Sequence, residues 1–194
     1  SLSAAPAPPP PYGEVWTSPP AMGQVGTEPQ GAAALSGSTF TVQTKDTVDY
    51  VYTVGTGGMT AGDFLRLEDP WGHGMRWSKW GSLQADASGC TPLAVETDEA
   101  SGGLVTVSTS GAATVALERS TTRDDPHTYA YTDVYLAEGS LEPGDTITVR
   151  VGDTDGGPDC GHQFPDRAFA HWRWRAFEHI GEVGFTAVAP YPEF

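Results

Sequence analysis

Three tryptophans lie within ten residues of one another, in a stretch with little strand pattern. Charged and polar side chains stand between them. Flat aromatic rings with hydrogen-bonding neighbours are suited to stacking on sugar rings and binding their hydroxyls. The alternative is that the rings cover one end of a hydrophobic core under a long loop. On the binding interpretation, the candidate ligand contacts are Trp71, His73, Arg76, Trp77 and Trp80.

A second polar segment carries three aspartates around a Gly-Gly-Pro sequence, namely Asp153, Asp155 and Asp159. Carboxylate oxygens on a flexible loop are ligands that calcium prefers. The segment lacks the glutamate that completes an EF-hand loop. Aspartate and glycine also dominate ordinary turns for backbone reasons. Calcium is therefore the cofactor that these residues would suit, with an ordinary turn as the alternative.

The two cysteines, Cys90 and Cys160, are far apart and form no CxxC pair, which disfavours a zinc site. A disulfide between them would close a loop of about 70 residues and stabilise the fold by about 4 kcal/mol. A reactive thiol is the alternative. The disulfide would join the tryptophan segment and the aspartate segment at one end of the domain. His73 and His162 could then meet near Asp69 or Asp159, as a metal or acid–base site.

Hydrolytic chemistry has little support beyond that pair, because the sequence contains no GxSxG, HExxH or HxH motif. The stretch 168–177 alternates strictly. It places Trp172 and Trp174 on one face and Arg173 and Arg175 on the other. The tryptophan face is expected in the core. The arginine face is expected to pair with carboxylates, with a small anion-binding patch as the alternative.

The composition limits the choice of partner. The chain of 194 residues has 25 acidic and 10 basic side chains, a formal net charge of −15. Nucleic acid and anionic membrane surfaces are thereby excluded as default partners, because phosphate binding needs clustered Lys and Arg. No apolar run approaches the roughly 20 residues of a membrane-spanning helix. Residues 1–100 and 101–194 are both acidic, which is typical of a solvated surface on a secreted domain.

The elements that would position these groups are strands. From residue 38 onward, apolar and polar residues alternate in short runs separated by Gly, Pro and Asp, as in an antiparallel sandwich with one buried face per sheet. The sequence therefore predicts an all-β antiparallel β-sandwich of about nine strands over residues 37–194. The expected strands begin or centre at 40–42, 48–54, 64–67, 104–107, 115–117, 131–136, 147–151, 169–177 and 183–188.

Residues 1–36 hold half of the 16 prolines and show no periodicity, so they are predicted to form an extended, proline-rich arm. The expected anchors of this arm on its own body or on a neighbouring chain are Tyr12, Val15, Trp16 and Met22.

Several motifs resemble those of a known protein family. They are Tyr52-Thr53-Val54-Gly55, Gly62-Asp63-Phe64-Leu65-Arg66-Leu67, Pro143-Gly144-Asp145-Thr146-Ile147 and Gly152-Asp153-Thr154-Asp155-Gly156-Gly157. In order and spacing they are similar to the amino-terminal β-sandwich of a family of mostly secreted bacterial proteins. In that family a larger domain follows, which resembles PHP-type metal-dependent phosphoesterases. The resemblance covers roughly residues 38–188. The three aspartates, the tryptophan segment and the cysteines depart from it, and the His-rich metal motifs are absent, so it implies a non-catalytic accessory sandwich.

Together these features predict a secreted or cell-surface binding module without catalysis of its own. Its expected partner is a polysaccharide, a neighbouring catalytic domain or another subunit. The alternatives are an assembly subunit that docks by its amino-terminal arm, and a metal-dependent hydrolase fragment.

Overall fold

The computed structural model describes residues 15–16, 30–36, 41, 44–68, 82–84, 90, 102–124, 127–163, 174–181 and 185–188. Within residues 15–16, 82–84, 102, 119–124 and 127–130 only the backbone is described. The described part consists of strands and two short 3₁₀ turns, η2 (Thr154–Gly156) and η3 (Pro158–Cys160), and contains no α-helix. The predicted all-β class is confirmed. No helix in this part is long and apolar enough to cross a membrane.

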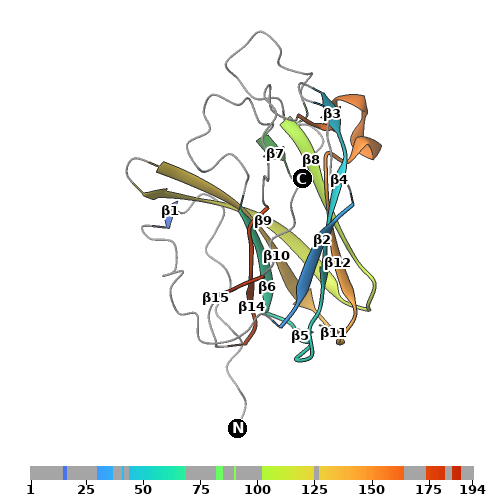
Figure 1. Cartoon of the computed structure of the whole chain (residues 1–194), viewed down its shortest axis with the longest axis vertical. Helices are drawn as coiled ribbons and strands as arrows, with labels where there is room; N and C mark the ends of the chain where they lie inside the picture. The colour runs from blue at the N-terminus through green and yellow to red at the C-terminus, as the bar shows by residue number, and fades with distance from the viewer. Residues whose placement is uncertain are drawn as a thin grey trace.

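Two large sheets form the sandwich, and Figure 1 shows them as two layers. The six-stranded sheet has the order β1 (Val15–Trp16), β9 (Thr114–Asp124), β10 (His127–Glu138), β6 (Phe64–Glu68), β14 (Ala176–His179), β15 (Phe185–Ala187). The five-stranded sheet has the order β2 (Ala32–Leu35), β4 (Val48–Thr53), β12 (Thr146–Val151), β8 (Gly102–Thr109), β7 (Ser82–Gln84).

Strand pairing is antiparallel except for β1 with β9 and β7 with β8, which are parallel. Two small ribbons complete the described fold, β3 (Lys45–Asp46) with β13 (His162–Gln163) and β5 (Met59–Thr60) with β11 (Ser140–Leu141). The described strands outnumber the nine expected because several contain only two residues, which is too short for an alternating pattern to reveal.

The core lies between the two sheets and follows the period of two that a strand imposes on its side chains. On β4, Val48, Tyr50 and Tyr52 point inward and are fully buried, and Ile147 and Val149 of β12 face the same interior. The six-stranded sheet supplies the opposite side of the core through Leu65, Leu67, Val134, Leu136 and Ala176, and Trp174, which precedes β14, packs with them. Each sheet therefore places its alternate residues on an outer face.

Strand β2 lies inside the range 1–36 that was expected to be an extended arm, and it pairs with β4 in the five-stranded sheet. The start of this strand is fastened by a buried carboxylate, because Glu178 accepts hydrogen bonds from the backbone N–H groups of Gln30 (2.5 Å) and Gly31 (3.1 Å). Gly55 approaches the Gln30 carbonyl too closely for any side chain at that position. The described backbone of Val15–Trp16 pairs with Thr121–Thr122 of β9.

Within the predicted strand at 169–177, residues 174–175 are not in a strand and β14 starts at Ala176. Residues 169–173 lie outside the described part, as does most of the predicted strand at 40–42.

Candidate functional site

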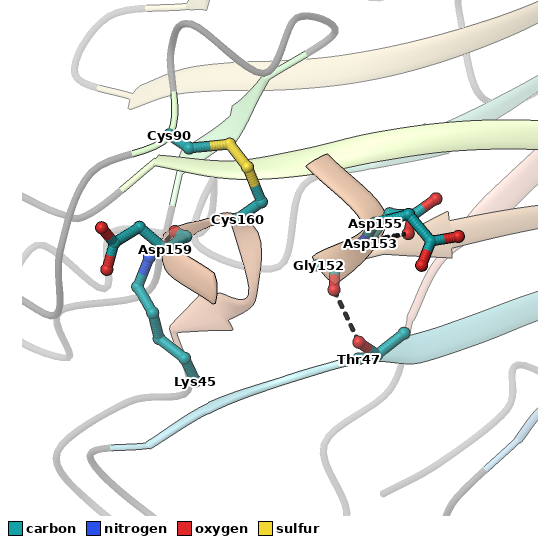
Figure 2. The surroundings of a disulfide bond; sticks show 8 residues. All are labelled: Lys45, Thr47, Cys90, Gly152, Asp153, Asp155, Asp159 and Cys160. Carbon is teal, nitrogen blue, oxygen red and sulfur yellow. Dashed lines mark hydrogen bonds between the residues drawn. A yellow bond between two sulfur atoms is a disulfide. The ribbon is translucent and has the colours of Figure 1, made fainter. Parts of the chain in front are cut away.

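The predicted disulfide is present. The sulfur atoms of Cys90 and Cys160 are 2.00 Å apart, and the two cysteines are separated by 70 positions in the sequence. The bond ties residue 90 to the η3 turn, beside the ends of β3 and β13 (Figure 2). We call this region the disulfide end. Residues 69–81, which contain Trp71, His73, Arg76, Trp77 and Trp80, lie outside the described residues, so their role in binding stays a prediction.

The three aspartates of the predicted calcium loop lie in different surroundings. The Asp153 carboxylate caps η2, accepting from the Asp155 backbone N–H (3.0 Å) and the Thr106 hydroxyl (2.5 Å). The hydrogen bond from Thr106 lowers the pKa of Asp153. Asp159 lies beside Cys160 and Lys45, apart from Asp153 and Asp155 (Figure 2). Across the described residues, no group of three or more His, Cys, Asp or Glu could hold a metal ion. Calcium binding stays a prediction.

The remaining polar groups of the disulfide end brace its turns. The Lys45 amine donates to the Asp159 carbonyl, and the Thr47 hydroxyl donates to the Gly152 carbonyl (2.6 Å). Burial lowers the pKa of Lys45, and the charge of Asp159 opposes that effect. His162, the described member of the predicted histidine pair, is fully buried. Its imidazole is therefore not presented to solvent for acid–base chemistry.

The outer face of the six-stranded sheet carries a row of aromatic side chains. Tyr135 of β10 is opposite Phe64 of β6, Phe64 is opposite His179 of β14, and His179 is opposite Phe185 of β15. The row therefore crosses four adjacent strands at right angles to them. All four side chains are half-buried, neither enclosed in the core nor fully exposed. We call these four residues the aromatic row.

The rings of the row pack on one another. The Phe64 ring centroid is 4.6 Å from that of Tyr135 and 4.8 Å from that of His179, and the second pair is nearly parallel at 12°. Phe185 stands across them, 5.3 Å from Phe64 and 5.4 Å from His179. The separations of Phe64 from Tyr135 and from His179 match the spacing of neighbouring strands, about 4.8 Å. Phe185 lies two strands from Phe64 and leans back toward it. Pairing and register, rather than loop conformation, thus fix the shape of the row.

A buried ion pair lies beside the row. Arg66 and Asp133 are opposite each other on β6 and β10. The Arg66 Nε and Nη2 atoms donate to the two carboxylate oxygens of Asp133 at 2.7 and 2.6 Å. Each residue is only 2% exposed. The Arg66 guanidinium also lies over aromatic rings, 4.7 Å from the Phe185 centroid and 5.0 Å from that of Tyr131. Such a pair holds the neighbouring rings in position through both hydrogen bonds and cation–π contacts.

The electrostatics of this face keep its aromatic groups neutral. Burial, assisted by the negative charge of Asp133, raises the pKa of Tyr135. Burial lowers the pKa of His179, and Asp63 opposes that effect while Arg66 reinforces it. The aromatic row therefore presents a phenol and a neutral imidazole near neutral pH.

The alternation predicted for residues 168–177 is confirmed where it is described. Trp174 is buried in the core, and the Arg175 Nη1 atom lies 3.2 Å from Oε2 of Glu68. The guanidinium of Arg175 also lies over the ring of Phe177, 5.5 Å from the ring centroid. For Arg175 the expected carboxylate pairing is thus observed, while Trp172 and Arg173 lie outside the described residues.

Sequence reasoning did not single out the aromatic row. Each of its residues lies in a segment predicted as a strand, or next to one, but no two come from the same strand. The available signal was the outward position in the alternation, occupied by an aromatic residue on each strand. Without the strand order, that signal does not show that the four rings meet.

Fold and site together define an all-β sandwich with an aromatic outer face. The sequence matches no protein-family model, and a comparison with curated proteins found no relative. A solved structure, a family 3a carbohydrate-binding module from the cipA scaffolding of Clostridium thermocellum, aligns over 81% of this chain and 98% of that one. The identity is 12% and the TM-score is 0.38.

Proposed function

We propose that this chain is a non-catalytic binding module that contacts carbohydrate through the aromatic row. The single observation that carries the proposal is the alignment of Tyr135, Phe64, His179 and Phe185 across four strands, half-exposed on one face. Phe185 leans back over Phe64 and His179, with ring centroids 5.3 and 5.4 Å away, so the four rings form a compact aromatic cluster. A cluster of this kind suits contact with a short stretch of polysaccharide.

The chemistry of the row supports a neutral ligand with both C–H and hydroxyl groups. Aromatic side chains provide apolar contact area, and a tyrosine hydroxyl or imidazole nitrogen adds a hydrogen-bonding group. Arg66 and Asp133, beside the rings, neutralise each other, so this pair offers no unpaired charge to a ligand. A chain of net charge −15 also favours an uncharged ligand over an anionic one.

The described contacts favour a binding module over an assembly subunit. Gln30 and Gly31 are held by Glu178 of the same chain, and the backbone of Val15–Trp16 pairs with β9 of the same chain. These parts of the predicted arm thus dock on their own sandwich. The disulfide supports an extracytoplasmic location, where such bonds persist.

Affinity electrophoresis in gels containing soluble xylan, glucomannan or hydroxyethyl cellulose tests the proposal. Retardation of the native chain by at least one polysaccharide is expected. Tyr135→Ala and Phe185→Ala, at the two ends of the row, should each weaken it roughly tenfold or more, since a buried aromatic contact contributes about 1.5 kcal/mol or more. Thr56→Ala, an exposed change in the turn between β4 and β5, is the control and should bind normally.

The triple variant Trp71→Ala, Trp77→Ala, Trp80→Ala distinguishes the two candidate surfaces. If this variant alone loses retardation and the row variants do not, the carbohydrate-binding site lies in residues 69–81 and not at the aromatic row. No retardation by any polysaccharide would refute carbohydrate binding. Circular dichroism of each variant confirms that the fold is retained.

A further inference from the structure

The outer face of the five-stranded sheet differs in character from the rest of this acidic molecule. Its side chains form three rows across β2, β4, β12 and β8, in register with the strand pairing. We call these residues the hydroxyl face. The first row is Ala32, Thr53 and Thr146; the second is Ala34, Val51, Thr148 and Ser108; the third is Ser36, Asp49, Arg150 and Thr106.

Every residue of this face is small or β-branched except one ion pair. Arg150 Nε and Nη2 donate to the two carboxylate oxygens of Asp49 at 2.8 and 3.1 Å, so the face as a whole carries no net charge. Within the described part of the chain, the side-chain hydroxyls of Thr53, Thr148 and Ser108 make no hydrogen bond. An area of small side chains with no net charge and with uncommitted hydroxyls thus lies on a protein of net charge −15.

The physical properties of the hydroxyl face suit a flat and rigid partner. Strand spacing places side chains about 4.8 Å apart across the sheet and about 6.7 Å apart along each strand. Threonine and valine are stiff at χ1, and alanine and serine have little side-chain entropy to lose. Many weak contacts can therefore form at once on a regular surface without ordering long side chains.

Other occupants fit less well. A second copy of the chain would bring two charges of −15 together while burying only small side chains, and stable interfaces rely on large aromatic and apolar residues. A basic protein partner would need an acidic surface, whereas the hydroxyl face carries no net charge. An ice-like water lattice would have to accommodate the projecting Asp49–Arg150 pair, whose side chains are 22% and 45% exposed. Sugar hydroxyls, in contrast, can replace water around both charges.

We propose that the hydroxyl face is a second binding surface, which lies flat on the side of bundled, uncharged polysaccharide chains. The inference rests on the proposed function, because it assigns the form of carbohydrate that the module would meet. The aromatic row would bind single chains on one sheet, and the hydroxyl face would contact packed chains on the other. A module with both surfaces could join a free chain to a bundle.

Pull-down on insoluble microcrystalline cellulose or chitin tests the hydroxyl face, with the soluble-polysaccharide gels run in parallel. The double variant Thr53→Val, Thr148→Val keeps side-chain shape and removes two hydroxyls, and should weaken binding to the particles about five- to tenfold. Ser108→Lys adds bulk and charge in the second row and should weaken it at least tenfold. Thr114→Val, exposed at the start of β9, is the matched control and should bind as the native chain does.

Loss of particle binding with unchanged gel retardation would establish two separate surfaces. Unchanged particle binding in both face variants would overturn this inference and leave the proposed function intact. Absence of gel retardation in the native chain would refute the proposed function itself. A different outcome is that the native chain does not bind the particles but inhibits ice recrystallisation, and that the face variants lose this inhibition. That result would overturn the inference and identify ice, rather than a polysaccharide bundle, as the ligand of this face.

Discussion

Arg66 illustrates how a charge can be buried in this sandwich. Burial alone would lower its pKa, but the hydrogen bonds and charge of Asp133 outweigh that effect and raise the pKa above its ordinary value. Buried pairs of this kind are expensive to break and contribute little beyond an apolar replacement. The pair therefore serves to organise the rings of Phe64, Tyr131 and Phe185 around the guanidinium.

Asp133→Ala is expected to lower the free energy of unfolding by about 3–5 kcal/mol, because the Arg66 charge would stay buried without its partner. The double variant Arg66→Leu, Asp133→Leu should lose much less, since no uncompensated charge remains. Denaturant titration of the native chain and both variants measures the difference. Equal losses in the two variants would contradict the uncompensated Arg66 charge as the cause.

His179 gives the aromatic row a dependence on pH. Its pKa is lowered in the folded chain, first by burial, so the unfolded chain takes up the proton at higher pH than the folded chain does. Stability should therefore fall as the pH drops from about 6.5, the ordinary histidine value, to the lower folded value. Urea unfolding of the native chain and of His179→Gln between pH 7.5 and 5 checks this. The variant should have the shallower slope over this window, and identical slopes would exclude His179 as the cause.

At the scale of elements, Glu178 links the two sheets through the start of β2. This carboxylate is buried on the inner side of β14, and it accepts from the Tyr52 hydroxyl on β4 at 2.6 Å as well as from two backbone N–H groups. Burial and the hydrogen bond to Glu178 raise the pKa of Tyr52. A strand at the edge of a sheet is thus fastened to the opposite layer by a charged hydrogen-bond acceptor.

Glu178→Ala is expected to lower the free energy of unfolding by about 3 kcal/mol, because it leaves three donors without their acceptor. Tyr52→Phe removes one of those hydrogen bonds and should cost about 1.5–3 kcal/mol. Hydrogen exchange locates the effect: the amides of β2 should lose more protection than those of β12. A uniform loss across both strands would show that Glu178 does not act specifically on β2.

At the scale of the whole molecule, the charge of −15 is spread over a sandwich whose described ion pairs join residues far apart in the sequence. Self-repulsion of a highly charged surface destabilises the compact state, and added salt screens it. The hydroxyl face is an exception to this acidic surface, and the aromatic row is supported by a neutralised pair. On the proposed function, recognition would take place on these two surfaces.

Raising NaCl from about 0.05 to 0.5 M is expected to stabilise the fold by about 1 kcal/mol, which corresponds to a rise in Tm of roughly 2–4 °C at this chain length. Differential scanning calorimetry across a salt series measures it. The Asp49→Asn, Arg150→Gln variant keeps the same net charge and serves as the control, with the same rise expected. A fall in Tm with salt would mean that attractive surface pairs outweigh the repulsion.

The sequence by itself determined the local properties of this protein. Alternation with a period of two predicted the strands at 48–54, 64–67 and 147–151 and the all-β class, because burying one face of a sheet requires that pattern. The cysteine pairing was also predicted correctly, since the chain contains only two cysteines. For residues 174–177, alternation assigned Trp174 to the core, and the excess of acidic residues favoured a carboxylate partner for Arg175.

Only the tertiary structure decided which residues share a surface. Phe64, Tyr135, His179 and Phe185 come from four strands, and the segments that hold them are far apart in the sequence. Their meeting depends on the strand order β10-β6-β14-β15 and on its register, which are set by long-range pairing rather than by local pattern. The same holds for Glu178, which reaches Gln30 across 148 positions. Side-chain periodicity is a local property, whereas neighbourhood across a sheet is a property of the whole chain.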